Sequence, residues 1–260
     1  MELAMVGVGN MGSAVLSGVL DAGLVPAAEV GVVDLAPERR AEFAKRGCQV
    51  SEDLKTVAGA KTTVLAVKPW LVDEVASGLG STQERVVSVM AGVSASTLHR
   101  VFGGGCRVVR TMPNTPCLLR QGVTGIAAGP GSTPEDVEYV ARMFRELGGV
   151  VEVDESLLDA VTAVSGSGPA WFFRFVEALE KAAVDLDLPP VDAATLVRST
   201  AAGAGQMMQG ENTPSTLRER VTTPGGTTAA GLDVFDRALD ALVREALTAA
   251  RDRAAELGRQ

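Results

Sequence analysis

A glycine-rich loop near the N-terminus has the spacing of a dinucleotide-binding motif. Gly7-Val8-Gly9-Asn10-Met11-Gly12 follows an apolar run typical of a strand and precedes a helical segment. In this context the first glycine permits a tight turn, the second admits a pyrophosphate, and the third lets the helix pack on the strand. The helix N-terminus then presents its amides to the anion. The sequence predicts cofactor contacts from Gly7, Gly9, Asn10, Met11 and Gly12, and the alternative is a purely structural turn.

An acidic residue after the second apolar run bears on the choice of nucleotide. Asp34 lies 22 residues after Gly12, where a carboxylate can hydrogen-bond the adenosine ribose 2′-hydroxyl. Such a carboxylate repels a 2′-phosphate and favours NAD, whereas the nearby Arg39 and Arg40 could hold that phosphate. NAD and NADP both stay open at this point, and Asp34 could also be a solvated acid beside a helix.

Two further segments lie where apolar runs end, at the edge of the sheet where open α/β sheets bind their ligands. The first is Ala66-Val67-Lys68-Pro69, whose proline removes a hydrogen-bond donor and fixes the turn. The second is Met112-Pro113-Asn114-Thr115-Pro116, in which two prolines flank a polar pair. The alternatives are an ordinary surface lysine at Lys68 and a simple rigid loop around Asn114.

A threonine- and glycine-rich loop precedes the last long helical segment. Thr223-Pro224-Gly225-Gly226-Thr227-Thr228 brings glycines and hydroxyl groups to a helix N-terminus. Free amides at such a terminus, with glycines that admit close approach, form a ready site for a carboxylate. Plain N-capping by Thr227 or Thr228 is the competing interpretation, and the two are compatible.

The first half of the chain alternates short apolar runs with helical stretches, a pattern typical of βα units around a parallel sheet. The predicted strands are 3–6, 30–33, 62–67, 86–90, 107–111, 123–128 and 150–153. The predicted helices between them are 11–22, 37–46, 71–78, 94–101 and 134–147. We therefore expect a Rossmann-like dinucleotide-binding domain over residues 1–153.

After about residue 154 the pattern becomes helical, with expected helices at 156–163, 170–185, 191–209 and 229–257. The predicted fold class is thus α/β, with the Rossmann-like domain followed by an all-helical domain over residues 154–260. The last helix carries an apolar stripe that must be buried, either inside the monomer or against a second copy. The stripe consists of Leu232, Phe235, Leu239, Leu242, Ala246 and Ala250.

Composition excludes several classes of protein and of mechanism. A net charge of −8 argues against a nucleic-acid partner, because phosphate binding rests on Lys and Arg. No stretch is both long enough and free enough of charged residues to predict a membrane span. The N-terminus lacks the basic region of a signal peptide, so we expect a cytoplasmic protein. Cys48, Cys106 and Cys117 have no metal-binding spacing and are expected to be reduced packing residues. A single histidine, His99, excludes multi-histidine metal centres, so no metal is expected.

Five segments, taken in order, resemble pyrroline-5-carboxylate reductases over nearly the whole chain. The glycine-rich loop and Ala66-Val67-Lys68-Pro69 are the less specific of these. The specific ones are Arg110-Thr111-Met112-Pro113-Asn114-Thr115-Pro116, Ser165-Gly166-Ser167-Gly168-Pro169-Ala170 and Thr223-Pro224-Gly225-Gly226-Thr227-Thr228. The resemblance implies NAD(P)H-dependent hydride transfer to the C=N carbon of 1-pyrroline-5-carboxylate, which gives L-proline.

The resemblance also implies roles for individual residues. Ala66, Val67, Lys68 and Pro69 would line the cofactor, and Asn114 would lie beside the nicotinamide. The loop of Thr223, Gly225, Gly226, Thr227 and Thr228 would bind the substrate carboxylate, with the Thr228 hydroxyl directed to the ring nitrogen as the catalytic contact. Glu211 matches an acidic residue near the family's site, although a solvated loop acid is the stronger interpretation. A homodimer, or an assembly of dimers, would have its substrate site near the dimer interface.

Two positions depart from the family pattern, and both concern the nucleotide. Asp34 replaces a small polar or basic residue, and Leu54 replaces an asparagine near the adenosine ribose. Two other classes of function remain as alternatives. A β-hydroxyacid-type dehydrogenase would need a catalytic lysine at a glycine-rich helix start, where this chain has Trp171-Phe172-Phe173-Arg174. A non-catalytic dinucleotide-sensing module would bind cofactor without turnover.

Overall fold

The computed structural model describes residues 1–258, which form two compact units. The first unit comprises Met1–Ser167 together with the end of the chain from Ala250, and the second comprises Gly168–Ala249. The sequence predicts a domain boundary after residue 153, whereas the division between the compact units lies after Ser167. The end of the last helix also groups with the first unit and not with the helical one.

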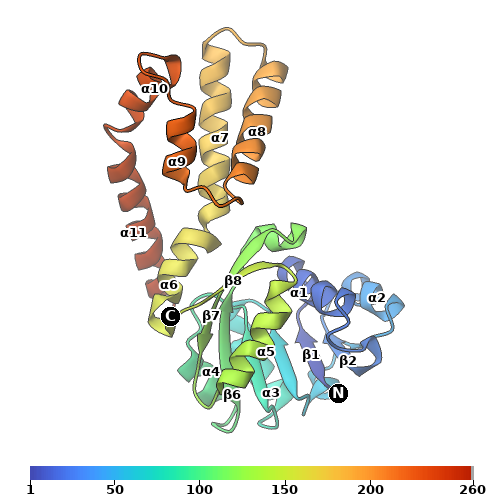
Figure 1. Cartoon of the computed structure of the whole chain (residues 1–260). Helices are drawn as coiled ribbons and strands as arrows, with labels where there is room; N and C mark the ends of the chain where they lie inside the picture. Colours follow the sequence, from blue (N-terminus) through green and yellow to red (C-terminus); the bar gives the residue numbers. More distant parts are fainter. Residues whose placement is uncertain (259–260) are drawn as a thin grey trace. The chain divides into compact units, whose positions relative to one another are not determined.

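The first unit is built on an eight-stranded sheet with the order β3-β2-β1-β4-β5-β6-β7-β8 (Figure 1). The strands are β1 (Leu3–Val6), β2 (Val30–Val33), β3 (Gln49–Ser51), β4 (Thr62–Leu65), β5 (Arg85–Ser88), β6 (Arg107–Met112), β7 (Gly122–Ala128) and β8 (Gly148–Glu152). Strand β1 pairs in parallel with β2 and β4, so Val6 lies opposite both Val33 and Leu65. The loops that follow these three strands therefore meet at one edge of the sheet.

The sheet differs from the sequence prediction at two strands. Strand β7 runs antiparallel to β6, because the segment between them, residues 113–121, holds only a 3₁₀ helix (Thr115–Leu119) and is too short for a crossover helix. Strand β3 was not predicted from the sequence, since it has only three residues, none of them buried. It pairs in parallel with β2 at the edge of the sheet. The sheet is thus parallel from β3 to β6, as the sequence predicts, but the antiparallel pair of β6 and β7 makes it mixed as a whole.

Alternating side chains of the strands belong to two hydrophobic cores, one on each face of the sheet. Helices cover both faces (Figure 1). Leu3 and Met5 of β1 belong to one core, whereas Ala4 and Val6 belong to the other. The first core is covered by α1 (Asn10–Asp21), α2 (Pro37–Lys45) and α5 (Pro134–Arg145). The second is covered by α3 (Val72–Leu79) and α4 (Ala95–Val101). Burial on both faces is expected of the parallel strands of an α/β fold.

The first unit ends in three short helical pieces where the sequence predicts one helix over 156–163. A 3₁₀ turn (Glu155–Leu157) leads into α6 (Leu158–Val161), and a π-helical turn (Thr162–Gly166) follows. The π turn lies within the segment that leads into the Ser165–Ala170 motif. Isolated π turns inside helices occur frequently at functional sites.

The second unit is helical, as the sequence predicts. Its helices are α7 (Gly168–Asp185), α8 (Pro190–Met207), α9 (Pro214–Arg220), α10 (Thr227–Phe235) and most of α11 (Leu239–Leu257). Helices α7 and α8 are joined by an ion pair in which Arg198 Nε lies 2.7 Å from Glu180 Oε1. The rings of Phe175 and Phe235 lie 6.1 Å apart between α7 and α10.

In the second unit one helix prediction was wrong, and one helix was missed. The single helix predicted over 229–257 is two helices, α10 and α11, separated by a break at residues 236–238. No glycine or proline marks this break in the sequence. Helix α9 was missed because it has only seven residues, although Thr213 caps it and Pro214 opens it. This Thr-Pro pair is a helix-start signal that could have revealed α9.

The apolar stripe predicted on the last helix is not buried within this chain. Leu242 keeps 63% of its surface exposed, and Phe235 and Leu239 each keep 40%. Burial of these three side chains inside the monomer was therefore a wrong alternative. The other alternative, burial against a second copy, stays open.

Candidate functional site

The glycine-rich loop is shaped by close packing against its neighbours. Gly7 has a φ of +89°, in the region that favours glycine, and its amide donates to the Val33 carbonyl oxygen at 2.7 Å. A Cβ atom on Gly7 would lie 2.7 Å from the Ala66 carbonyl oxygen, and one on Gly12 would overlap the Gly7 carbonyl group. Gly7 and Gly12 are therefore required by the fold of the loop itself.

Gly9 differs from the other two glycines because its missing side chain leaves open space. Among the described residues, apart from the chain next to Gly9, Arg39 Nη1 is the one atom within 4 Å of a Cβ placed on Gly9, at 3.6 Å. Gly9 is also the N-cap of α1, and it provides no side-chain cap to the first amides of that helix. Asn10 is exposed and Met11 is half-buried at the same helix start. The opening at Gly9, beside the positive end of α1, fits the pyrophosphate of a dinucleotide.

Asp34 is tied to the glycine-rich loop by its carboxylate. Asp34 Oδ2 accepts the Val8 amide at 2.8 Å, and Oδ1 accepts the Ala36 amide at 2.9 Å. The structure thus brings Asp34 and the glycine loop together, as the sequence predicts. The Val8 amide was not among the predicted site groups, because a backbone contact of this kind carries no sequence signal.

The Ala66–Pro69 segment lies against the same loop. The Ala66 amide donates to the Val6 carbonyl oxygen at 2.8 Å. The Val67 side chain lies 3.0 Å from the position that a Gly7 Cβ would take. Lys68 is exposed, with its Nζ 6.0 Å from the centre of the Trp70 ring, and Pro69 opens a short 3₁₀ helix. Ala66 and Val67 therefore form one wall of the glycine loop.

Asn114 has a structural bond in addition to its predicted role. Its side chain is buried, and its Oδ1 accepts the Val123 amide at 2.9 Å. This bond ties the proline-flanked loop to the start of β7 and occupies the acceptor end of the amide group. Contact between Asn114 and a nicotinamide stays a prediction.

The last residue of β6 also packs against the π-helical turn. A Cβ atom on Gly166 would lie 2.6 Å from Met112 Cε, the flexible end of that side chain. Glycine at this position lets Met112 lie against the turn without moving aside, and the contact places two of the specific motifs side by side within the first unit. Met112 was not predicted as a positioning residue, although it lies within the quoted Arg110–Pro116 motif.

The threonine- and glycine-rich loop lies in the second unit and leads into α10. Gly225 has a φ of +71°, and the Gly226 amide donates to the Thr223 carbonyl oxygen at 3.0 Å. Gly226 is the N-cap of α10 and provides no side-chain bond, so N-capping by Thr227 or Thr228 was a wrong alternative. Both threonines lie in the first turn and are exposed. Uncapped amides and exposed hydroxyl groups at this helix start are suited to a carboxylate.

Glu211 is an exposed residue of the connection between α8 and α9. Its place in the second unit is compatible with either the family role or a solvated loop acid. Any contact with substrate at Glu211 stays a prediction.

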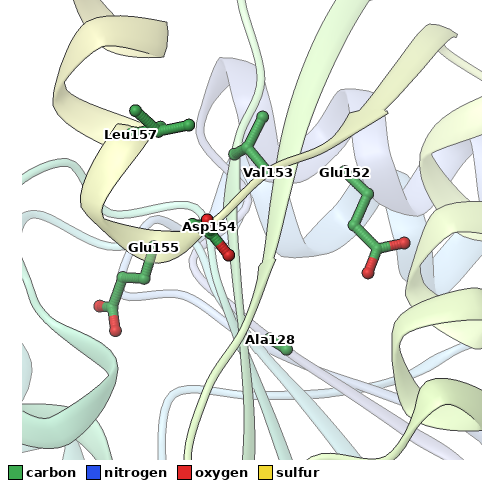
Figure 2. Close-up of a pocket in the computed structure, with 6 residues that line it drawn as sticks. All are labelled: Ala128, Glu152, Val153, Asp154, Glu155 and Leu157. Carbon is green, nitrogen blue, oxygen red and sulfur yellow. The ribbon is translucent and has the colours of Figure 1, made fainter.

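An acidic cavity of about 440 Å³ lies in the first unit near the end of β8 (Figure 2). It is lined by Ala128, Glu152, Val153, Asp154, Glu155 and Leu157. Glu155 Oε1 already accepts the Ala95 amide at 2.7 Å and Arg110 Nη1 at 2.9 Å. None of the predicted site residues lines this cavity, and its carboxylates would repel an anionic cofactor or substrate.

The remaining reactive side chains of the described residues have structural surroundings. Burial raises the pKa of the thiols of Cys48, Cys106 and Cys117, and all three are free. His99 Nδ1 lies 2.9 Å from the Cys106 carbonyl oxygen. Within residues 1–258 no group of three or more His, Cys, Asp or Glu side chains is placed to hold a metal ion. Over the same residues, no helix is both long and apolar enough to cross a membrane.

Comparison with protein families divides the chain into two matched regions. Residues 155–257 match the family described as pyrroline-5-carboxylate reductase dimerisation. Residues 2–92 match the family described as NADP oxidoreductase, coenzyme F420-dependent. The first of these matches begins next to the domain boundary predicted from the sequence.

Individual relatives match over the full length of the chain. A pyrroline-5-carboxylate reductase of Pseudomonas aeruginosa is 39% identical over 100% of this chain and 97% of its own. One of Methanosarcina acetivorans is 36% identical over 100% of this chain and 98% of its own. The solved structure of such a reductase from Coxiella burnetii has a TM-score of 0.91 at 32% identity and covers 100% of this chain and 99% of its own. One from Plasmodium falciparum, with NADP bound, has a TM-score of 0.84 at 26% identity over 99% and 98%. The chain therefore belongs to the pyrroline-5-carboxylate reductase family.

Proposed function

We propose that this protein reduces 1-pyrroline-5-carboxylate to L-proline with a reduced nicotinamide dinucleotide. The observation that carries the proposal is a pair of helix starts, one in each unit, whose N-cap glycines leave the first amides without a side-chain cap. Gly9 opens space at the start of α1, and Gly226 opens α10 without a side-chain cap. The first suits the pyrophosphate of a dinucleotide and the second suits the carboxylate of a small substrate.

The residues of the first unit fit a dinucleotide. Gly7, Gly9 and Gly12 shape the loop, while Asn10 and Met11 begin the helix whose amides would face the pyrophosphate. Asp34, directly after β2, would accept a hydrogen bond from a ribose hydroxyl group. Ala66–Pro69 would form another wall of the cofactor site. Asn114 would face the ring end of the cofactor. When bound, the reduced nicotinamide would supply the hydride for the C=N carbon.

The residues of the second unit would hold the substrate. We propose that the loop of Thr223, Gly225, Gly226 and Thr227 binds its carboxylate and that the Thr228 hydroxyl bonds the ring nitrogen. A cyclic imine that is protonated near neutral pH is already electrophilic, so orientation does much of the work and no strong protein acid is required. Glu211 would contact the substrate at the edge of this site.

The substrate site would be completed by a second copy of the chain. The family match over residues 155–257 is to a dimerisation domain, and the exposed apolar side chains of α10 and α11 support an interface there. We propose a homodimer or an assembly of dimers, with no nucleic-acid or membrane partner. Buried, unpaired cysteines are typical of a reducing compartment, and we propose a cytoplasmic location.

The direct test follows the loss of reduced-nicotinamide absorbance when 1-pyrroline-5-carboxylate is added to the purified protein. NADH and NADPH are run in parallel, and the product is identified by mass spectrometry. Turnover to proline with either cofactor is expected. A folded protein that binds a dinucleotide but leaves this substrate unchanged would favour the dinucleotide-sensing alternative.

Thr228→Ala tests the role of the hydroxyl group. We expect kcat to fall about 10- to 100-fold, because the contact to the ring nitrogen is lost in the transition state. Cofactor affinity, measured by fluorescence titration, should stay unchanged. Thr228→Ser keeps the hydroxyl group and is the matched control, for which we expect most of the activity. Unchanged kcat in Thr228→Ala would remove this residue from the mechanism.

A further inference from the structure

We propose that this chain prefers NADH over NADPH and that the Asp34 carboxylate sets the preference. The inference rests on the dinucleotide binding proposed above and adds the identity of the nucleotide. It is carried by the hydrogen bonds of Asp34 and Arg40 and by the ion pair of Arg39 with Asp34, at the carboxyl end of β2. From the sequence alone these three residues left the nucleotide open, since the arginines could offset the acid.

The Asp34 carboxylate is held in one position. Each of its oxygen atoms accepts one backbone amide, from Val8 at 2.8 Å and from Ala36 at 2.9 Å. A carboxylate offers about four acceptor positions, so about two remain for the hydroxyl groups of a ribose. The side chain is only 10% exposed, and the two amides hold it beside the glycine loop. It therefore cannot turn away from a 2′-phosphate without giving up both bonds.

Arg40 is bound by other groups and is not available to a phosphate. Its Nη1 donates to the carbonyl oxygens of Asp34 and Leu35, and its Nη2 lies 3.4 Å from Glu52 Oε2. The side chain is 16% exposed. To reach a ligand, the guanidinium group would have to leave two carbonyl groups and a carboxylate.

Arg39 is exposed and forms an ion pair with Asp34, and it lies toward the glycine loop, where the pyrophosphate would bind. Its Nη1 is 3.9 Å from Asp34 Oδ2 and 3.6 Å from the position that a Gly9 Cβ would take. A charge at this place acts on the pyrophosphate, which NADH and NADPH share, and so does not discriminate between them. The 2′-phosphate of NADPH would instead lie beside the Asp34 carboxylate. Glu52, the partner of Arg40, would be a second negative charge nearby.

Repulsion between this fixed carboxylate and a 2′-phosphate should dominate the choice of cofactor. We expect NADH to bind at least about tenfold more tightly than NADPH, because like charges brought together weaken binding strongly. The equilibrium dissociation constants of both cofactors, measured by isothermal titration calorimetry without substrate, test this ratio directly.

The variant that tests the assignment is Asp34→Ser, which removes the charge and keeps a small polar group. Its NADPH dissociation constant should fall and its NADH constant should rise, so that the preference shrinks at least about tenfold. Glu38→Gln is the matched control, since it removes one negative charge from the exposed start of α2, two residues into the helix. It should keep the wild-type ratio.

The outcomes separate this inference from the proposed function. Equal or tighter binding of NADPH by the wild-type protein would overturn the inference, and this measurement decides it even if Asp34→Ser does not fold. A preference for NADH that persists in folded Asp34→Ser would also overturn it. Failure of the wild-type protein to bind either dinucleotide would overturn the proposed function, and the inference with it.

Discussion

The two units of this chain differ in whether their own residues complete a core. In the first unit the sheet is buried on both faces, and each face has its own apolar cluster. In the second unit, Gly168 and Ala193 are the only buried residues. Large side chains there stay open to solvent, among them Phe172 at 67% exposed. The first unit thus has cores of its own, whereas the second unit leaves its apolar side chains open, as the second copy proposed above would require.

The energetic reason lies in the apolar surface of the second unit. Burying one large aliphatic or aromatic side chain contributes about 1.5 to 3 kcal/mol. A pair of helices joined by an exposed ion pair, such as Arg198 with Glu180, gains little from that pair. Apolar side chains along α7, α10 and α11 would contribute to stability if the proposed second copy buried them.

A charge placed on the exposed apolar face of α11 should have the largest effect. Leu242→Glu would put a carboxylate into the interface that we propose with the second copy. We expect the dimer to dissociate at micromolar concentration and the reductase activity to fall about 100-fold or more, since an unpaired buried charge costs several kcal/mol. Light scattering and the absorbance assay measure the two effects.

The control for this variant lies on the same helix. Arg244 is exposed and lies two residues from Leu242, which places it about 200° around the helix. Arg244→Glu should leave the dimer intact. A Leu242→Glu protein that remains dimeric and active would show that this face of α11 is not part of the interface.

A buried carboxylate should give a large effect on the stability of the first unit alone. Burial opposes ionisation of Asp136, but the Thr133 amide and the Arg85 guanidinium group hold its pKa below the ordinary value. Asp136→Asn removes the carboxylate partner of Arg85 and leaves Arg107 with Glu84 alone. We expect a loss of about 2 to 3 kcal/mol in unfolding free energy. Chemical denaturation measures this loss. Glu138→Gln, at an exposed pair with Arg145, should change little.

The same carboxylate predicts a dependence of stability on pH. Because the folded-state pKa is lowered, Asp136 stabilises the fold above its unfolded pKa, and this contribution is lost as the pH falls through the folded-state value. The difference between wild type and Asp136→Asn should therefore be full at neutral pH and shrink in acid, below about pH 3.9. A difference that stays constant into acid would contradict the assigned pairing.

A substitution in the glycine loop should affect binding and spare the fold. Gly9→Ala adds a Cβ atom that meets only Arg39 Nη1, at 3.6 Å. We expect an unchanged melting temperature and a dinucleotide dissociation constant that rises about tenfold, since the methyl group enters the opening for the pyrophosphate. Gly12→Ala is the contrasting variant, because its Cβ atom would overlap the Gly7 carbonyl group and destabilise the unit itself. Unchanged dinucleotide binding by Gly9→Ala would show that the pyrophosphate does not bind at Gly9.

Local patterns in the sequence predicted most of the first unit. Each strand predicted there exists, because short β-branched runs between helical stretches are a strong local signal. The direction of β7 was not predictable in this way, since it depends on how far the chain travels between β6 and β7. Strand β3 lacks the buried apolar residues on which strand prediction relies.

The sequence predicted which segments lie together at the candidate cofactor site, whereas their binding roles stay predictions. The glycine loop, Asp34 and Ala66–Val67 meet as expected, because they follow adjacent parallel strands. Two features depended on tertiary contacts and were not predictable: the Val8 amide on Asp34, and the Asn114 Oδ1 bond to the Val123 amide. The exposure of Leu242 was also left open, since periodicity shows which residues need burial but not which partner buries them.

The molar mass of the wild-type protein in solution tests the difference between the two units most directly. Light scattering coupled to size exclusion at micromolar concentration should give an integer multiple of 26.8 kDa, with two chains or more, from a sample that is active in the reductase assay. A monodisperse and fully active monomer of 26.8 kDa would contradict the account, because the second unit would then be complete without a second copy.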